Sequence, residues 1–349
     1  MLQIFNPDHD QCLANGNRYY CSSATSLKFA EDCADIMRYA DDTLCLLPGT
    51  DIRVWGWDQV VRQRLLNMGI DPSLLPDDEM LERIRNLSHR RTSLEMNAFL
   101  KQKLSGQERL AYPFQTEIRD MEQLLQTVRK HGSCIVKAPW SSSGKGLRRL
   151  YDGEVTGNEL GRIARLIAKQ GSVIVESLDE VVLDFAMLFE TDGQNTSFRG
   201  YSLFENERCA YSRGILAGDT HIHNLLASYV GAGLVIELRE ALSAFLNLRL
   251  CGSYRGPLGV DMYICRSPRG EYLLRPCVEI NLRLTMGFVA HRLCSEYFSP
   301  EAEGHYALQL LHSFSNSELR RQISEPQVLK LLTPLREDSN YAFVIARVR

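Results

Sequence analysis

The sequence predicts an α/β protein of the mixed α+β kind, in which a small α/β unit precedes a larger part built from two blocks. Three observations carry this prediction. The chain has 349 residues, enough for two or three domains of about 150 residues each. Strand and helix patterns alternate over about the first 70 residues, as in a small unit with a parallel sheet. Later strand patterns follow one another closely, which favours an antiparallel sheet.

The first expected domain spans residues 1–88. In chain order, the patterns predict a strand at 2–6, a helix at 24–40, strand-like pieces at 43–47 and 52–55, and a helix at 58–68, where Val60, Val61, Leu65 and Leu66 recur at helical spacing. Two prolines, an acidic turn and then the basic cluster His89-Arg90-Arg91 place a boundary near residue 88.

Three further segments are expected. Residues 89–178 predict helices at 93–103, 119–131 and 156–169 and strands near 113–117, 133–137, 147–150 and 172–176. Residues 179–300 predict strands at 183–191, 197–205, 209–216, 257–264 and 271–280, with helices at 232–247 and from 287. Residues 301–349 are expected to form a helical tail that ends in a strand at 341–348.

The composition excludes several classes of protein. With 44% hydrophobic and 24% charged residues it is that of a soluble globular protein. The net charge of −3 offers no electrostatic reason to expect nucleic acid or an anionic membrane as a partner. No apolar run approaches the roughly 18 residues that span a bilayer. The first residues, MLQIFNPDHDQ, do not resemble a signal peptide, so we expect a cytoplasmic protein.

Ten cysteines are scattered without a C-x-x-C pair. The first four, Cys12, Cys21, Cys33 and Cys45, are too widely spaced for a zinc ribbon or a redox motif. Reduced and mostly buried thiols are the favoured interpretation, and a disulfide framework is the alternative.

The first chemical signal is CIVKAPWSSSGKGL at 134–147. An apolar strand delivers Lys137, and a loop of serines and glycines leads directly into a second strand. Glycines let backbone N–H groups approach a polyphosphate, and lysines neutralise its charge. A Walker A loop would run into a helix, so a lid between two antiparallel strands fits better. A plain Ser/Gly hairpin turn with a solvated Lys137 is the alternative.

The second signal is PLGVDMYICRSPRGEYLLRPCVEINLRLTMG at 257–287. Glu279 and Asn281 lie two residues apart on one strand, so their side chains share a face. If the preceding strand is an antiparallel neighbour, Asp261 can join them. Two carboxylates and an amide oxygen are hard ligands that suit Mg²⁺ held together with substrate phosphates. Arg283 continues the alternation and could touch a transferring phosphoryl group; a polar, solvent-facing side of a sheet is the alternative.

Together, the two signals resemble the ATP-grasp superfamily in order and content. In that family a lysine closes a strand before a Ser/Gly-rich lid, as in KAPWSSSGKG, and a glutamate follows at a strand end, as in VIVES at 173–177. The metal ligands then come as a strand aspartate followed by Glu-x-Asn, as in GVDMY and CVEINLRLTMG. The resemblance covers roughly residues 89–295 and implies two lobes with ATP between them, preceded by a small domain.

The resemblance also implies roles for individual residues. Lys137 would contact the α-phosphate and the adenine. Asp184 would bind the ribose, with Asp179 and Glu180 as competing candidates. The remaining ATP-binding residues would be Ser141, Ser142, Ser143, Gly144, Lys145 and Gly146 of the lid and Glu176, Ser177 and Leu178 of the hinge. Asp261, Glu279 and Asn281 would bind one or two Mg²⁺ ions, with Mn²⁺ as an alternative. Arg283 would steady the γ-phosphate or an acyl phosphate. Arg90 or Arg91 would replace the family's earlier lysine, with Arg91 preferred.

The implied function is that of an ATP-dependent carboxylate–amine ligase working through an acyl phosphate. Its partners would be a small-molecule or peptide carboxylate and an amine. A kinase on the same fold and a non-catalytic MgATP-binding module are the alternatives. The sequence names neither substrate nor an oligomeric state.

Two weaker patterns complete the candidates. In GDTHIHN, Asp219, His221 and His223 could form a zinc site if the segment is a strand, because H-x-H then places both imidazoles on one face. A substrate-side loop and ordinary surface polarity are the alternatives, and a zinc hydrolase would be a further function. In NPDHD at residues 6–10, Asp8, His9 and Asp10 end the first expected strand. Strand ends of α/β units are common ligand positions, which suggests a substrate-side role, and a helix-capping turn is the alternative.

Overall fold

The computed structural model describes residues 2–40, 49–141, 146–207, 210–299 and 302–348. The N-terminal domain pairs β1 (Leu2–Ile4) and β2 (Ile52–Val54) in parallel, as predicted for a small α/β unit. Around them lie α1 (His9–Asn15), α2 (Ala24–Asp32), the 3₁₀ helices η1 (Ala34–Tyr39) and η2 (Pro72–Leu74), α3 (Gln59–Asn67) and α4 (Asp78–Leu87). The helix expected over 24–40 is therefore α2 followed by η1, and the piece expected at 43–47 lies outside the described residues.

A four-stranded antiparallel sheet forms the next unit, in the order β3 (Gln115–Ile118), β6 (Val173–Ser177), β4 (Cys134–Lys137) and β5 (Leu147–Leu150). It follows α5 (Arg91–Lys103). Helices α6 (Met121–His131) and α7 (Gly157–Gln170) place Leu124, Val128 and Ile163 in one hydrophobic core with the strands. Helix α7 begins with a capping box between Thr156 and Glu159, which satisfies backbone donors at its start.

The largest sheet has eight strands, in the order β11 (Tyr272–Asn281), β10 (Gly256–Arg266), β7 (Glu180–Thr191), β8 (Thr196–Glu207), β9 (Ala210–Leu216), β12 (Tyr306–His312), β14 (Tyr341–Arg347) and β13 (Val328–Leu331). Its neighbouring strands are antiparallel throughout. The segment 301–349 was expected to be a helical tail. Its described residues, 302–348, contain the α-helix α11 (Asn316–Ile323) and three strands that extend this sheet. The expected final strand is present as β14.

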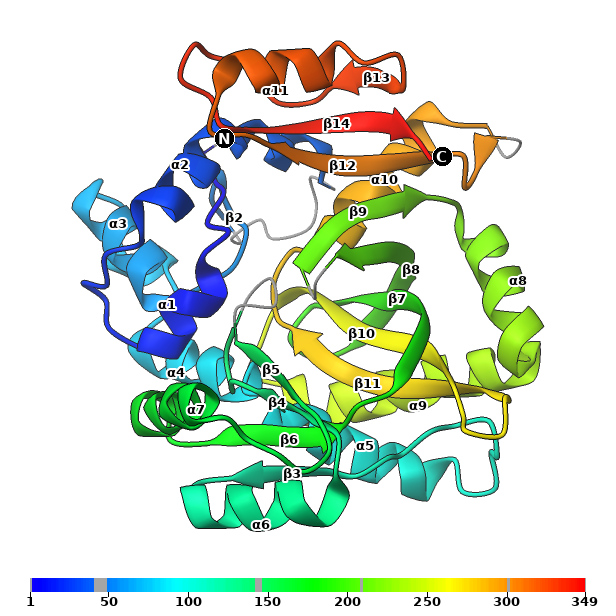
Figure 1. Ribbon diagram of the computed structural model, residues 1–349. Helices are drawn as coiled ribbons and strands as arrows, with labels where there is room; N and C mark the ends of the chain where they lie inside the picture. Colours follow the sequence, from blue (N-terminus) through cyan, green and yellow to red (C-terminus); the bar gives the residue numbers. More distant parts are fainter. Residues whose placement is uncertain (1, 41–48, 142–145, 208–209, 300–301, 349) are drawn as a thin grey trace.

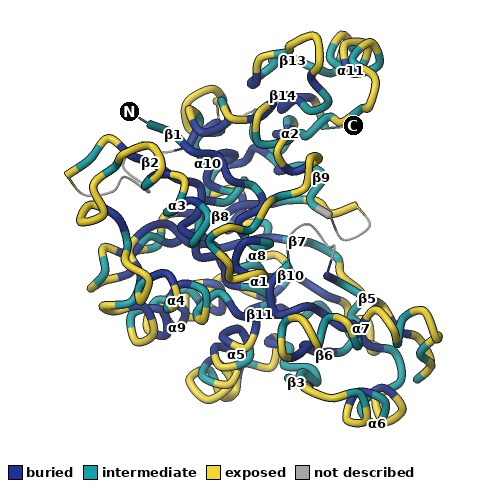
Figure 2. Tube along the Cα trace, turned by 90° about the vertical axis from the view of Figure 1, so that its left-hand side faces the viewer, coloured by how far each residue is buried: buried dark blue, intermediate teal, exposed yellow. Residues whose placement is uncertain are grey.

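Alternation along the strands separates two cores on opposite faces of this sheet. Phe185, Met187 and Phe189 of β7 pack with α8 (Asp219–Val230) and α9 (Ala232–Leu250). Ala186 and Leu188 face the other way, where α10 (Met286–Tyr297) and the N-terminal domain cover the sheet. Figure 1 shows the resulting arrangement, with the N-terminal domain beside the two sheets, and Figure 2 shows buried positions concentrated along the strands of the large sheet.

Helix α8 was not expected. The GDTHIHN segment that a zinc site would need as a strand begins this helix instead, so His221 and His223 do not share a strand face. Among the described residues, no helix has both the length and the apolar character needed to cross a bilayer.

Candidate functional site

A cavity of about 830 Å³ lies between the four-stranded sheet, the N-terminal domain and the face of the eight-stranded sheet that carries Ala186. Its polar wall contains most of the residues that the sequence singled out. The predicted residues that line it are Lys137, Ser141, Glu176, Ser177, Leu178, Asp184, Asp261, Glu279, Asn281 and Arg283, together with Arg90, Asp179 and Asp10. Segments that are far apart in the sequence therefore meet around one space.

Lys137 ends β4 and is buried beside Glu176 of β6, with which its ammonium group forms an ion pair. Arg275 of β11, 1% exposed, donates from Nη2 to Glu176 Oε2 at 2.8 Å and to Gln115 Oε1 at 2.9 Å. Burial, followed by the guanidinium groups of Arg90 and Arg275, lowers the pKa of Lys137. Burial and the two guanidinium groups thus disfavour the charged form of Lys137, and its ion pair with Glu176 favours that form.

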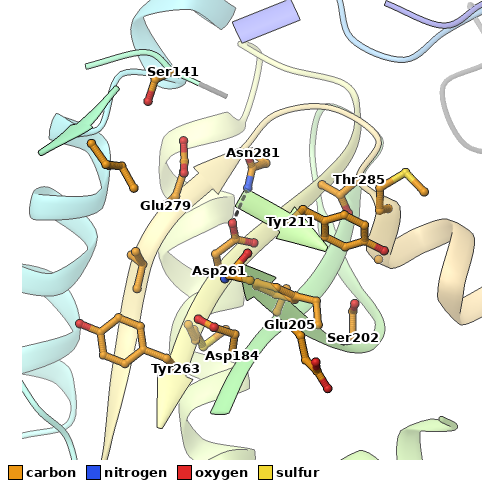
Figure 3. Close-up of a pocket in the computed structure, with 18 of the residues that line it drawn as sticks. Ser141, Asp184, Ser202, Glu205, Tyr211, Asp261, Tyr263, Glu279, Asn281 and Thr285 are labelled. Atoms are coloured by element: carbon orange, nitrogen blue, oxygen red, sulfur yellow. Dashed lines mark hydrogen bonds between the residues drawn. The ribbon is translucent and has the colours of Figure 1, made fainter. Parts of the chain in front are cut away.

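The register that a shared metal site requires is present. Strands β10 and β11 are antiparallel neighbours in which Asp261 lies opposite Glu279 and Gly259 opposite Asn281. Asn281 Nδ2 donates to Asp261 Oδ2 at 3.0 Å, and Figure 3 shows Asp261, Glu279 and Asn281 at the same wall of the cavity. The pairing of β10 with β11 is irregular between the Asp261–Glu279 pair and the Tyr263–Arg275 pair. Pro276, which has no N–H to donate, lies in this interval.

The charge balance at this wall suits a cation. Burial and the nearby Glu279 carboxylate raise the pKa of Asp261 to about 7. A divalent ion would relieve this repulsion. In the described part of the chain, no three His, Cys, Asp or Glu side chains gather into a metal site of their own. The donors present, two carboxylates and one amide, fit Mg²⁺ that shares its remaining positions with water and phosphate oxygens.

Of the two candidate arginines, Arg90 lines the cavity, whereas the sequence analysis preferred Arg91. Arg91 is 45% exposed and forms an ion pair with Glu117, away from the cavity. Arg90 is 6% exposed; it donates from Nη1 to Ser141 Oγ at 2.9 Å and from Nη2 to Glu279 Oε2 at 2.7 Å. Successive residues at a helix start point about 100° apart, so only one of the two can face inward. Hydrophobic spacing did not identify which one.

Arg283 lies at the junction with the N-terminal domain. It donates from Nη2 to Asp10 Oδ2 at 2.9 Å and to Asn281 Oδ1 at 3.0 Å. Asp10 belongs to α1, so the NPDHD segment does contribute to the cavity, through Pro7 and Asp10. His9 and Asp8 of the same segment are buried, and His9 Nδ1 lies 3.0 Å from Asp58 Oδ2.

The ends of the expected lid lie close together. Ala138 N donates to Gly146 O at 2.9 Å, and a Cβ on Gly146 would come within 2.5 Å of Ser141 Cβ, so this closure requires glycine. Strands β4 and β5 are antiparallel neighbours on either side, as the lid interpretation requires. Ser142, Ser143, Gly144 and Lys145 lie outside the described residues.

Besides Glu176, two acidic side chains that follow the hinge line the cavity. Asp184 of β7 lines it, and burial raises the pKa of its carboxyl group. Asp179, in the connection between β6 and β7, accepts from Tyr263 Oη at 2.6 Å. Glu180 does not line the cavity and pairs instead with Arg266.

The pair His221 and His223 does not belong to this site, since neither lines the cavity. Sequence reasoning missed Arg275 and Tyr263, which brace the hinge. An arginine inside the apolar run YLLRPCV is unusual enough to signal a buried partner, but the partner, Glu176, is 99 residues away.

Comparison with solved structures finds the same architecture. The chain superposes on N5-carboxyaminoimidazole synthetase from Staphylococcus aureus complexed with ADP, with a TM-score of 0.55 and 13% identity, over 99% of this chain and 92% of that one. It matches a biotin carboxylase–ATP-analogue complex from Campylobacter jejuni with a TM-score of 0.52 and 12% identity, over 99% and 81%. An Aspergillus clavatus N5-carboxyaminoimidazole synthase with ADP and 5-aminoimidazole ribonucleotide gives 0.50 and 11%, over 86% and 83%. No protein-family model matches the sequence, and no curated protein matches it significantly.

Proposed function

Because the chain has the ATP-grasp fold, as the sequence predicted, we propose that it is an ATP-dependent ligase that joins a carboxylate to an amine. The observation that carries the proposal is the convergence of Lys137, Arg90 and the Asp261–Glu279–Asn281 set on one cavity. Cations for a polyphosphate and hard oxygen donors for Mg²⁺ thereby face the same space. Similar solved structures were determined with ADP or an ATP analogue.

In the proposed reaction, a carboxylate oxygen attacks the γ-phosphorus of ATP, the bond to the β-phosphate oxygen breaks, and ADP leaves. The amine nitrogen then attacks the acyl carbon, the carbon–oxygen bond to phosphate breaks, and the amine loses a proton to water or buffer. When bound, Mg²⁺ would supply charge neutralisation of the phosphates. Phosphoryl transfer needs little covalent help, so the protein acts mainly by positioning.

Each residue has a defined part in this proposal. Lys137 binds the α-phosphate, and Arg90 binds the β- or γ-phosphate once it releases Glu279. Asp261, Glu279 and Asn281 would hold one or two Mg²⁺ ions, or Mn²⁺ in their place. Arg283, held in position by Asp10, orients the carboxylate and steadies the acyl phosphate. The hinge residues Glu176, Ser177 and Leu178 border the adenine, and Asp184 or Asp179 the ribose.

The test is a screen for ADP release with MgATP across amino acids, peptides and other carboxylates, with and without amines. Hydroxylamine traps an acyl phosphate as a hydroxamate, which separates the outcomes. ADP release with hydroxamate or amide formation supports the ligase. A stable phosphorylated product indicates a kinase, and nucleotide binding without ADP release across the panel contradicts the proposal.

A further inference from the structure

We propose that the end of the cavity formed by β12, β14 and the N-terminal domain binds the bulky apolar group of the carboxylate substrate, an aromatic or branched aliphatic acid. This inference rests on the proposed function, because it names the class of acid that would be phosphorylated. Its evidence is that the residues lining the cavity change from polar to apolar across one face of the eight-stranded sheet.

The polar part of this face follows the strand pairing. Asp261 lies opposite Glu279 on one side and Ala186 on the other, and Ala186 lies opposite Ser202. These four residues form one row across β11, β10, β7 and β8, and all except the small Ala186 are polar. At about 4.8 Å per strand, Ser202 lies about 10 Å across the sheet from Asp261. Figure 3 shows Ser202 and Asp261 on the same side of the sheet.

Past this row, Glu205 and Asn206 of β8 and Tyr211 of β9 still line the cavity, and at β12 and β14 the lining becomes apolar. Leu310 of β12 lies opposite Phe343 of β14, and both line the cavity. The N-terminal domain faces them with Phe5, Phe29 and Trp55, which also line it. The rings pack into one apolar wall, in which Phe29 and Leu310 are partly exposed and Phe5, Trp55 and Phe343 are buried. Ring centroids are 5.1 Å apart for Phe5–Trp55, 5.6 Å for Phe5–Phe29 and 6.1 Å for Phe29–Phe343. Such a wall favours an apolar group, since contact with it removes apolar surface from water.

The positions of the cations disfavour a phosphorylated group at this end. Within the described part of the chain, the cationic residues that line the cavity are Arg90, Lys137, Arg149 and Arg283. The first three belong to the nucleotide side, and Arg283 lies beside the candidate metal ligands through Asn281. A buried phosphate among Phe5, Leu310 and Phe343 would have no counter-charge, which is costly. An acid with one carboxylate near Arg283 and an apolar body meets no such penalty.

The volume leaves room for this second substrate. Small-molecule sites usually enclose about 300–1,000 Å³, and this cavity, at about 830 Å³, is near the upper end. Nucleotide and acid can therefore occupy it together, with the two reacting groups between the metal ligands and Arg283.

The experiment compares acids by ADP release with MgATP and hydroxylamine. The apolar arm is phenylalanine, leucine and 3-phenylpropionate, and the polar arm is aspartate, glutarate and 3-phosphoglycerate. We expect kcat/KM to be at least ten times higher in the apolar arm. Preference for the polar arm would overturn the inference and leave the proposed function standing, whereas failure to bind ATP by calorimetry would remove the proposed function itself.

Variants locate the subsite. Leu310→Lys should raise the KM for apolar acids at least tenfold and leave the KM for ATP within about twofold, while Leu310→Met should behave like the wild type. Leu329→Lys, at an exposed position of β13 in the same sheet and outside the cavity, is the matched control. Calorimetric binding of 3-phenylpropionate in the presence of MgADP gives a readout independent of turnover. Unchanged kinetics and binding in a folded Leu310→Lys protein would place the acid elsewhere.

Discussion

Arg90 and Glu279, 189 residues apart in the sequence, form an ion pair of 2.7 Å across the candidate site. The guanidinium group enters from the segment before α5, and the carboxylate from β11. Without a cation or nucleotide, each group therefore neutralises the other. A nucleotide with Mg²⁺ offers both a better partner: phosphate for Arg90 and the metal for Glu279. The pair accordingly marks where the phosphates are expected to lie.

Substitutions should distinguish the role of Arg90 in ATP binding from that of its neighbour Arg91. We expect Arg90→Ala to weaken ATP binding at least tenfold, because a charged hydrogen bond is worth about 1.5–3 kcal/mol. Arg91→Ala should change it less than twofold, since an exposed ion pair contributes about 0–1 kcal/mol to stability and Arg91 faces away from the cavity. Calorimetry with ATP and MgATP measures both. Equal effects of the two variants would refute the assignment of Arg90.

Removing Lys137 should also weaken nucleotide binding. Lys137→Ala deletes a buried cation from the phosphate side of the cavity, so ATP affinity should fall at least tenfold. Lys169→Ala, at an exposed position of α7, is the control. Circular dichroism checks that the variant folds, because Glu176 loses its ion-pair partner. Wild-type affinity in a folded variant would contradict the phosphate-binding role.

Glu279→Gln keeps the side-chain size and removes a charge. It should abolish turnover while weakening ATP binding much less, because the metal contributes most where charge develops in phosphoryl transfer. Glu271→Gln, in the exposed connection before β11, should behave like the wild type. ADP release and calorimetry together test this difference. A Glu279→Gln enzyme with undiminished turnover would argue against the metal site.

The protonation of Asp261 predicts how cation binding depends on pH. Its pKa is raised from 3.8 to about 7, so a proton competes with the cation below pH 7. The affinity for Mn²⁺ with ADP should rise between pH 5.5 and 7.5 and then level off. Asp261→Asn should bind Mn²⁺ more weakly and lose this pH dependence. A wild-type affinity that stays flat over this range would contradict the assignment.

The same raised pKa affects stability without ligands. The folded state holds the proton more tightly than the unfolded state, so this contribution is fully present below pH 3.8 and is lost as pH rises through about 7. At pH 8, Asp261→Asn should therefore unfold at a higher temperature than the wild type. At pH 5 the difference should shrink, which thermal unfolding at the two pH values would show.

The sequence by itself predicted most of the helices and strands before residue 301, and it predicted which candidate side chains share a strand face. A strand period of two placed Glu279 and Asn281 on one face, and the Ser/Gly run after Lys137 specified a turn between two strands, because these are local properties of the backbone. β5 spans the same residues, 147–150, as predicted, and most other element ends lie within a few residues of prediction.

The tertiary structure decided what long-range packing controls. Arg90 rather than Arg91 faces inward, Arg275 braces Glu176, and Asp10 reaches Arg283 across 273 residues. The chain after residue 301 forms strands because the exposed edge of β9 provides hydrogen-bond partners for β12, and β12 then does the same for β14. Local sequence preferences cannot identify these partners. Each pair comes into contact only when the two sheets and the N-terminal domain close around the cavity.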